Sequence, residues 1–231
     1  MPKKSAGSGN RIPSGISGLD GYIEGGFIPN DVYLVTGGTG TGKTLFCCQF
    51  LWEGLQRGEN GIFFSLEELP EDILSDAEAF GWDFKKYIEQ KKFTIQYYDP
   101  FEMMDIATEV KDVIKKVGAK RVVVDSTSIF GMIFESEHEL RKKMYEFIKV
   151  LKGTGCVVVM TAEILEEQKG LSRYGVEEFV VDGVIVLNFL GIGDVASRSL
   201  LIRKMRRTDH GTNVYPFSIT KNGIKLEKEK Y

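Results

Sequence analysis

Gly37-Gly38-Thr39-Gly40-Thr41-Gly42-Lys43-Thr44 is the stretch of sequence that decides the fold. It matches the pattern G-x-x-x-x-G-K-[ST], the P-loop, in which glycines let backbone N–H groups turn inward around phosphate oxygens. The lysine of this pattern, here Lys43, meets the β- and γ-phosphates, and the hydroxyl of Thr44 ligates Mg²⁺. A predicted strand at Asp31–Thr36 precedes the loop, and a predicted helix through about Arg57 opens at its end, adding partial positive charge. The stretch therefore predicts a site for a nucleoside triphosphate, namely ATP with magnesium.

Outward from the loop, strand-like and helix-like segments alternate. The segments expected to be strands are Gly61–Leu66, Phe93–Tyr98, Arg121–Ser126 and Cys156–Thr161, and the first and the last of these are expected to be buried. The predicted helices between them are Glu71–Phe80, one that starts at the capping signature Asp99-Pro100-Phe101-Glu102, and one capped by Ser136 with Glu139. Four strands then follow without helices between them: Val180–Leu190, Ser197–Arg206, Val214–Thr220 and Ile224–Glu227. This order predicts an α/β fold, a mostly parallel central sheet flanked by helices with antiparallel strands at its C-terminal side.

Composition sets limits on the class of protein. A length of 231 residues with 42% apolar content suits one domain, expected at residues 11–231 after a flexible tail at residues 1–10. A net charge of −3 gives no general attraction to nucleic acid or to anionic lipid. Three cysteines in apolar segments are expected to be buried thiols, and two histidines make a zinc site improbable. No apolar run is long enough to span a bilayer, so a cytoplasmic protein is expected.

Acidic residues end two of the predicted strands. Val122-Val123-Val124-Asp125 has the form of a Walker B strand, and its carboxylate is either a helix cap or, given the P-loop, a group that reaches Mg²⁺. Glu67 and Glu68 end the strand at Gly61–Leu66. They either orient or deprotonate the water that attacks the γ-phosphate, or stand as acidic first-turn residues before the next helix.

A basic cluster ends a later strand, at Lys204-Met205-Arg206-Arg207-Thr208-Asp209-His210. One interpretation is a solvated charged face. The other is an arginine-finger device, which stabilises transition-state charge on the nucleotide of a neighbouring subunit. The residues alone leave both interpretations open.

Taken in order, these motifs resemble the KaiC-like branch of the RecA superfamily of ATPases, from about Arg11 to Lys225. The resemblance is carried by Gly15-Ile16-Ser17-Gly18-Leu19-Asp20, Gly25-Gly26-Phe27-Ile28-Pro29, the P-loop, Phe64-Ser65-Leu66-Glu67-Glu68, the Asp125 strand and Thr161-Ala162-Glu163. Two further blocks are the specific ones, because general P-loop proteins lack them: residues 173–180, Arg-Tyr-Gly-Val-Glu-Glu-Phe-Val, and Lys204-Met205-Arg206 with Thr208 and His210.

The resemblance implies a role for each matched position. Glu67 and Glu68 would be the catalytic carboxylates, acting with Lys43 and Arg206, while Thr44 and Asp125 would hold magnesium. The chain's own nucleotide would be bound by Gly40, Thr41, Gly42, Lys43, Thr44 and Leu45. Lys204 and Arg206, with Met205 between them, would reach the γ-phosphate bound to the adjacent subunit. Near the ribose and base of that same nucleotide would lie Thr208, His210, Thr220 and Lys221.

The family relationship also implies an assembly and a strand order. Sites shared between subunits imply a ring, typically a hexamer. The Asp125 strand would lie between the Glu67 strand and the Cys156 strand, which would neighbour the P-loop strand. KaiC itself has two tandem domains, whereas this chain has one. An adjacent Ser-Thr pair takes up phosphate in KaiC's second domain, and the aligned residues here are Glu178 and Phe179, which cannot accept it.

Three functions remain in competition at this point. The first is a magnesium-dependent ATPase whose hydrolysis changes the shape of a ring, in a regulatory or conformational role. The second is a RecA/RadA-like recombinase that acts on DNA. Its DNA-contacting loop would correspond to residues 164–179, where four glutamates stand against Lys169 and Arg173, a poor footprint for phosphate backbones. The third is a nucleotide-gated scaffold that hydrolyses little ATP.

Overall fold

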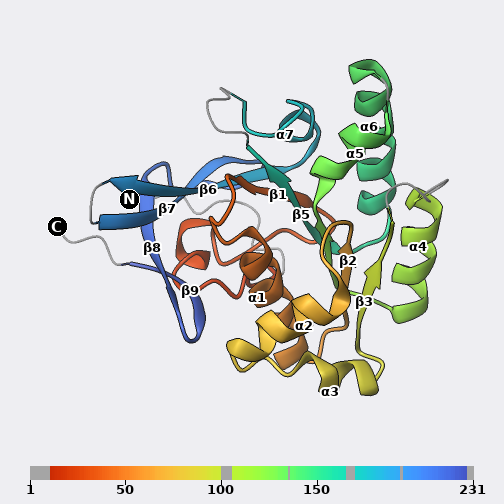
Figure 1. Ribbon diagram of the computed structural model, residues 1–231, viewed down its shortest axis with the longest axis horizontal. Helices are drawn as coiled ribbons and strands as arrows, with labels where there is room; N and C mark the ends of the chain where they lie inside the picture. The colour runs from red at the N-terminus through yellow and green to blue at the C-terminus, as the bar shows by residue number, and fades with distance from the viewer. Residues whose placement is uncertain (1–10, 100–105, 135, 165–169, 193–194, 228–231) are drawn as a thin grey trace.

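A computed structural model of the chain describes residues 11–99, 106–134, 136–164, 170–192 and 195–227, and they build one sheet of nine strands with helices on both faces (Figure 1). The sheet has the order β3-β2-β4-β5-β1-β6-β7-β8-β9. The strands are β1 (Val32–Gly37), β2 (Gly61–Ser65), β3 (Phe93–Tyr97), β4 (Arg121–Asp125), β5 (Val157–Glu163), β6 (Gly183–Ile192), β7 (Val195–Met205), β8 (Val214–Thr220) and β9 (Gly223–Leu226). The helices are α1 (Lys43–Gln56), α2 (Pro70–Ala79), α3 (Phe84–Glu89), α4 (Ile106–Val117), α5 (Phe130–Ile133), α6 (Glu137–Lys152) and α7 (Glu177–Val180), with 3-10 turns at Asp20–Tyr22 and Thr127–Ile129.

Six strands that are consecutive in the sheet, β3, β2, β4, β5, β1 and β6, run parallel to one another. Their apolar residues point alternately to the two faces, as strand geometry requires. Val35 and Phe63 join the cluster beneath α1, α2 and α3, whereas Leu34 and Phe64 join the cluster beneath α4, α5 and α6. Figure 1 shows these two groups of helices on opposite sides of the strands. Burial on both faces explains why β1, β2, β4 and β5 are apolar at most positions, whereas the edge strand β3, with Thr94 and Gln96, is only partly buried.

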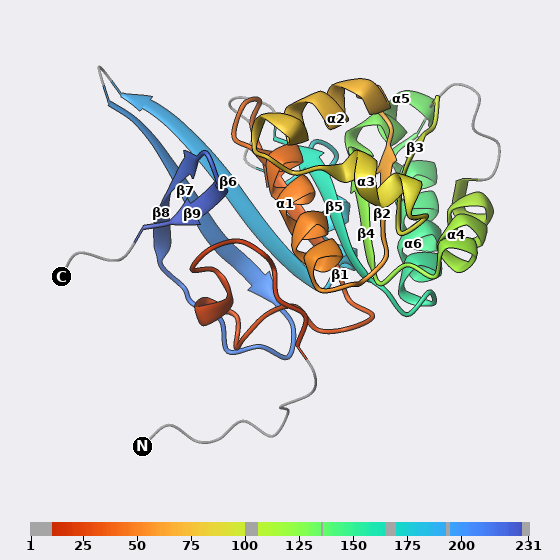
Figure 2. The ribbon, with the colours of Figure 1, turned by 90° about the horizontal axis from the view of Figure 1, so that it is seen from below.

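The C-terminal strands turn the sheet antiparallel. β6 pairs parallel with β1 on one side and antiparallel with β7 on the other, and β8 and β9 continue as antiparallel neighbours. Figure 2 shows β6 to β9 as a twisted ribbon beside the helix-covered part of the molecule. The segment before β1 lies against this ribbon, since Ser17 forms a bridge with Lys225.

The structure confirms the α/β fold, the mixed sheet and the strand order that the resemblance implied, with β4 between β2 and β5 and with β5 beside β1. The cap at Ser136 is also as predicted, because its hydroxyl accepts a hydrogen bond from the Glu139 N–H at 3.2 Å. All three cysteines are free and buried. The predicted tail at residues 1–10 and the capping signature from Pro100 onward lie outside the described residues.

Several short elements were not predicted, and one strand boundary was wrong. The helices α3, α5 and α7 are four to six residues long, too short for a periodic pattern to identify. The strand expected at Val180–Leu190 begins only at Gly183, because Glu177–Val180 forms α7. Val176 and Val180 both pack against the cluster beneath α6, so the local apolar run serves a helical turn before it becomes a strand.

Candidate active site

The P-loop connects the end of β1 to the start of α1, with its backbone shaped by glycines. Gly40 and Gly42 have φ angles of 72° and 102°, in the left-handed region that favours glycine. A Cβ atom added at Gly38 or Gly40 would meet no heavy atom within 4 Å, so the loop borders open space there. The Lys43 ammonium donates to the carbonyl oxygens of Gly37 at 3.1 Å and Gly38 at 2.9 Å. The loop thus forms a cradle with a cation at its base, at the N-terminus of a helix of 14 residues.

Asp125 ends β4 within reach of this loop. Its buried carboxylate accepts a hydrogen bond from the Thr161 hydroxyl at the end of β5, and the Thr44 hydroxyl is a further partner. Burial raises the pKa of Asp125, while the hydrogen bonds from Thr161 and Thr44 oppose that rise. Thr44 and Asp125, expected from the sequence to hold magnesium, are therefore side by side.

The donor set fits a magnesium ion brought by a nucleotide. Among the residues that the structure describes, no three His, Cys, Asp or Glu side chains gather as they would around a metal held by protein alone. A hydroxyl and one carboxylate suit Mg²⁺, which keeps several waters and shares its remaining positions with substrate phosphates. Together with the open cradle at Gly38 and Gly40, this arrangement fits a magnesium–nucleoside triphosphate.

The two glutamates lie beyond the end of β2, which stops at Ser65. The alternation of side chains along a strand therefore does not force Glu67 and Glu68 to point to opposite faces of the sheet. The Ser126 hydroxyl donates to the Glu67 carboxylate at 2.6 Å, which places Glu67 next to Asp125. Burial raises the pKa of Glu67 and of Glu68, and the charge of Asp125 raises both further, although the Ser126 hydrogen bond lowers that of Glu67.

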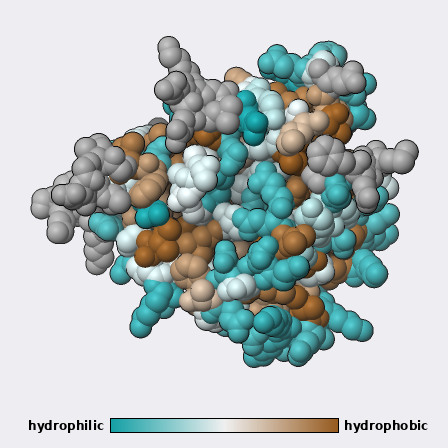
Figure 3. Space-filling model, in the orientation of Figure 1, coloured by the Kyte–Doolittle hydropathy of each residue, from teal (hydrophilic) through white to brown (hydrophobic). Residues whose placement is uncertain are grey.

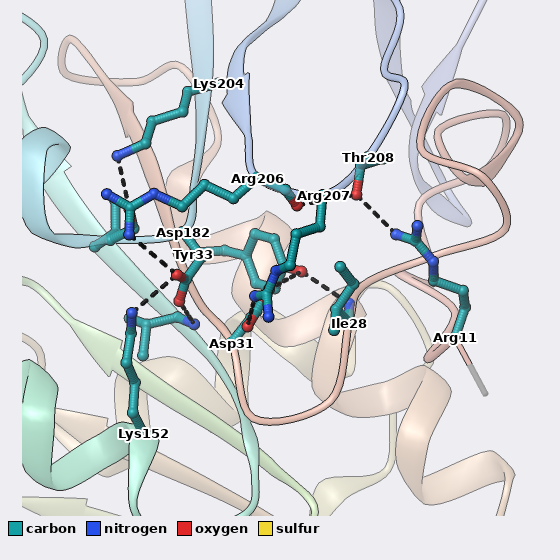
Figure 4. A network of polar contacts seen from close by, with 12 residues as sticks. Arg11, Ile28, Asp31, Tyr33, Lys152, Asp182, Lys204, Arg206, Arg207 and Thr208 are labelled. Atoms are coloured by element: carbon teal, nitrogen blue, oxygen red, sulfur yellow. Dashed lines mark hydrogen bonds and ion pairs between the residues drawn. The ribbon is translucent and has the colours of Figure 1, made fainter. Parts of the chain in front are cut away.

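The basic cluster lies elsewhere, at the end of β7 and in the turn that follows it (Figure 4). The Lys204 ammonium donates to the carbonyl oxygens of Glu178 at 2.9 Å and Val181 at 2.7 Å. The Arg206 guanidinium lies 3.5 Å from an oxygen of the Asp182 carboxylate and donates to the Phe179 carbonyl oxygen at 3.4 Å. Both cations are therefore held by the segment that contains α7 and leads into β6.

Sheet register places this cluster at the opposite end of the strands from the P-loop. Gly183 of β6 pairs with Met205 of β7 on one side and with Tyr33 of β1 on the other. The P-loop begins at Gly37, level with Leu187. Four residue steps of about 3.3 Å separate the two levels, roughly 13 Å. We call the P-loop end of the parallel strands the carboxyl edge, and the end that holds Met205 the amino edge.

The other predicted nucleotide-binding residues divide between the two edges. Thr208 accepts a hydrogen bond from the Arg11 guanidinium at 2.9 Å, and His210 follows in the same turn, so both lie on the amino edge with Arg206. The side chain of Met205 is buried in the core. Leu45 packs against the core cluster beneath α1.

Thr220 and Lys221 lie on the other edge, in the turn between β8 and β9. Ile219 ends 3.5 Å from where a Cβ of Gly42 would stand, so this turn is next to the chain's own P-loop. The resemblance had grouped these two residues with Lys204 and Arg206 around a neighbour's nucleotide. The geometry instead favours the chain's own nucleotide, because β8 and β9 run back along α1, where the Gln49 amide carbonyl oxygen accepts from the Ile224 N–H at 2.6 Å.

Sequence reasoning missed several supporting residues of both edges. Ser126 and Thr161, which hydrogen-bond Glu67 and Asp125, belong to segments that the sequence analysis quoted without giving them a role. Asp31 and Asp182, which pair with Arg207 and Arg206, were not singled out at all. Each stands immediately before an apolar strand, a position that in sequence resembles an ordinary strand or turn boundary.

The fold and the carboxyl edge together define a P-loop NTPase with a RecA-like fold. Residues 12–231 match the protein family described as "ATPase: KaiC". The chain therefore belongs to the KaiC family of ATPases, and membership implies nucleotide binding.

Individual relatives agree with this assignment. A UPF0273 protein of Methanopyrus kandleri is 33% identical over 239 residues, covering 95% of this chain and 93% of that protein. The circadian clock oscillator protein KaiC of Synechococcus elongatus is 37% identical over 223 residues, covering 91% of this chain but 43% of the clock protein. The chain thus spans less than half the length of that clock protein. The crystal structure of a KaiC-like protein from Pyrococcus horikoshii is similar with a TM-score of 0.86 at 39% identity, covering 95% of this chain and 99% of that one.

Within the described residues, no helix combines the length and the apolar character needed to cross a membrane. The face drawn in Figure 3 mixes hydrophilic side chains with smaller groups of apolar ones.

Proposed function

We propose that this chain is a magnesium-dependent ATPase whose catalytic site is completed between neighbouring subunits of a ring, with a hexamer as the expected form. The observation that carries the proposal is the separation of the two edges within one chain. The P-loop, Asp125 and Glu67 lie at the carboxyl edge, while the cations Lys204 and Arg206 lie at the amino edge. Neither cation can serve the chain's own phosphates from there, so a second subunit has to bring the two edges together.

At the carboxyl edge each residue has a distinct task. Lys43 and the backbone N–H groups of the loop bind the β- and γ-phosphates. Thr44 and Asp125 hold Mg²⁺, which when bound neutralises charge on the β- and γ-phosphate oxygens. Glu67, oriented by Ser126, and Glu68 position the attacking water and accept its proton. Their raised pKa values suit a proton acceptor better than those of exposed glutamates would.

At the amino edge the cations serve the neighbour. Arg206 and Lys204 stabilise negative charge as it redistributes over the γ-phosphoryl group in the transition state, so they contribute more to turnover than to ATP binding. Arginines supplied in this way are worth about 10³–10⁵ in rate in other phosphoryl-transfer systems.

The test is complementation between two inactive variants. Arg206→Ala is expected to assemble and bind ATP with near-parent affinity, with turnover lower by about 10³ or more. A Glu67→Gln, Glu68→Gln double variant, called the carboxylate variant below, should also bind and assemble without turnover, because an amide cannot accept the proton. Mixing the two should restore part of the phosphate release, since some interfaces then pair intact glutamates with an intact arginine.

The mixture also identifies the ways in which the proposal fails. Subunit exchange is confirmed by native mass spectrometry of differently labelled chains. If exchange occurs and no activity returns, Arg206 does not act on a neighbour's nucleotide. If the carboxylate variant hydrolyses ATP at the parent rate, the catalytic assignment of Glu67 and Glu68 is wrong.

A further inference from the structure

Asp182 is a buried carboxylate at the amino edge, outside the motifs that the proposed chemistry uses. Its side chain is 5% exposed. One carboxylate oxygen accepts from the Lys152 ammonium at 2.8 Å and lies 3.5 Å from the Arg206 guanidinium. The other accepts from the Val32 N–H at 3.1 Å. Figure 4 shows the side chains of Lys152 and Arg206 pointing toward Asp182.

The backbone of Asp182 makes two further connections. Its N–H donates to the Val32 carbonyl oxygen at 2.8 Å, and its carbonyl oxygen accepts from the Arg206 N–H at 2.9 Å. Val32 is the first residue of β1, the strand that leads into the P-loop. Asp182 therefore ties Arg206, through both main chain and side chain, to the start of the P-loop strand.

A buried carboxylate is expensive unless donors satisfy it, and Asp182 has more partners than stability alone requires. Lys152 and the Val32 N–H satisfy one oxygen each, at 2.8 Å and 3.1 Å. The contact with Arg206 is thus additional for Asp182, whereas for Arg206 it is the one ion pair among the described residues. The contact therefore matters mainly for where the Arg206 side chain is held.

The contact restricts the orientation of the guanidinium group. One terminal nitrogen faces Asp182 and the other faces the Phe179 carbonyl oxygen, so the plane of the group is fixed from its inner side. Nearly half of the side chain, 48%, remains exposed. Asp182 also offsets the repulsion between Arg206 and Lys204, a repulsion that, after burial, is the next cause of the lowered pKa of Lys204.

We infer that Asp182 is a positioning residue for the trans-acting Arg206, holding its guanidinium in the orientation that meets the neighbouring subunit's nucleotide and coupling it to the first residue of the P-loop strand. This inference rests on the proposed function, since it assigns Asp182 a task in the same shared site. It predicts that an Asp182 variant loses turnover because its Arg206 is misplaced, while its own P-loop and glutamates stay intact.

Asp31 provides a matched control on the same edge. It is a buried aspartate that stands directly before β1, as Asp182 stands directly before β6. It pairs with Arg207, the residue after Arg206, and accepts from the Tyr33 hydroxyl at 3.3 Å. Asp31 and Asp182 therefore share burial and location and each contacts one arginine, while Asp182 also contacts Lys152 and the Val32 N–H.

The experiment compares Asp182→Asn with Asp31→Asn in the full chain. Both variants are checked for ring mass, melting temperature and ATP affinity, and both are expected to lose some thermal stability. Turnover at saturating magnesium-ATP should fall on the order of 10- to 100-fold for Asp182→Asn, the effect of losing one charge-assisted contact, and less than about twofold for Asp31→Asn. Lys152 is 34% exposed, so its ammonium can turn to water when the carboxylate is removed.

Complementation then locates the defect. Asp182→Asn should regain turnover when mixed with the carboxylate variant, and should regain none when mixed with Arg206→Ala, because both of those chains offer a defective cation side. Should Asp182→Asn not assemble, the same mixtures are made with Asp182→Glu, which keeps the charge and displaces the carboxylate by one methylene. That variant should lose at least about tenfold in turnover and show the same pattern of rescue.

Three results overturn the inference. They are parent-like turnover of the assembled Asp182 variant, an equal loss in Asp31→Asn, and rescue by Arg206→Ala in place of the carboxylate variant. The pair of Arg206→Ala with the carboxylate variant serves as the reference. If that pair also fails with exchange confirmed, the shared site fails and the role of Asp182 fails with it. If that pair succeeds while the Asp182 mixtures fail, only the role of Asp182 is wrong.

Discussion

The two edges of the parallel sheet handle charge in opposite ways. At the carboxyl edge, Asp125, Glu67 and Glu68 form no ion pair within the described residues, and burial raises the pKa of each. At the amino edge, the buried carboxylates Asp31 and Asp182 each already contact an arginine. Within the described residues the three acidic side chains of the carboxyl edge therefore have no ion-pair partner, and under the proposed function a magnesium ion would add positive charge beside them. At the amino edge both buried carboxylates already have cationic partners, and the Arg206 side chain remains partly exposed to solvent.

The comparison predicts that the P-loop and the amino edge affect different steps. Under the proposed function, the P-loop residues of the carboxyl edge bind the chain's own nucleotide and should govern affinity, whereas Glu67 and Glu68 at the same edge should govern turnover. Residues at the amino edge should govern rate in the neighbour, with little influence on affinity.

The largest expected effect on ATP affinity comes from Lys43→Ala. The change removes the charge that meets the β- and γ-phosphates, and a charge-assisted hydrogen bond is worth about 1.5–3 kcal/mol. ATP affinity should fall at least on the order of 10- to 100-fold, as measured by calorimetric titration. Arg206→Ala is the natural comparison, because it is expected to leave affinity near the parent value. Unchanged binding by Lys43→Ala would contradict the assignment of the P-loop, and equal losses in both variants would erase the distinction between the edges.

A pH profile should report both edges at once. Burial raises the pKa values of Glu67 and Glu68 above the ordinary 4.5, so the base form is lost as pH falls through a range above 4.5. Burial and the nearby Arg206 lower the pKa of Lys204 below 10.5, so its charge is lost as pH rises, earlier than for an exposed lysine. Turnover at saturating magnesium-ATP should therefore follow a bell-shaped curve, falling about tenfold per pH unit beyond each limit.

Substitution assigns the two sides of that curve. Lys204→Arg should move the alkaline side of the curve to higher pH and leave the acid side in place, because a guanidinium stays charged over the whole pH range of the curve. An alkaline side that does not move with Lys204→Arg would show that Lys204 does not limit turnover.

The last prediction expects no change in the protein: the chain should not become phosphorylated when it is incubated with magnesium-ATP. Glu178 and Phe179 stand where KaiC's second domain carries an adjacent Ser-Thr pair, and neither side chain has a hydroxyl to phosphorylate. In the structure they lie in α7, next to Lys204 at the amino edge, with the Phe179 side chain 69% exposed. Intact-protein mass spectrometry after incubation with magnesium-ATP should find the unmodified chain. A stable gain of one phosphate would contradict the expectation that this chain does not phosphorylate itself.

Much of the carboxyl edge was predictable because its chemistry is local in sequence. The P-loop is contiguous, and Asp125, Glu67 and Glu68 each follow an apolar strand. Strands of a parallel sheet present their ends at one edge, so the meeting of these residues follows from the fold class. The partners Ser126 and Thr161 could not be assigned, because which neighbouring strand end faces which is fixed by the order β2-β4-β5-β1.

The amino edge was predicted less completely. The sequence indicated the basic cluster but not the carboxylates that contact Arg206 and Arg207, since Asp182 is 24 positions from Arg206, and Asp31 is 176 positions from Arg207. The position of the turn at Thr220 and Lys221 beside the chain's own P-loop could not be predicted for the same reason. Its position beside Gly42 depends on how β8 and β9 fold back along α1.

By itself, then, the sequence determined the class of ligand and the fold, because a phosphate cradle and an alternation of buried strands with helices are short-range patterns of residue type. Only the tertiary structure decided that the glutamates and the arginine stand at opposite ends of the same strands, and that Asp182 joins the arginine to the P-loop strand. The physical reason is that register and long-range ion pairs depend on which strands become neighbours, and residue spacing along the chain does not encode that choice.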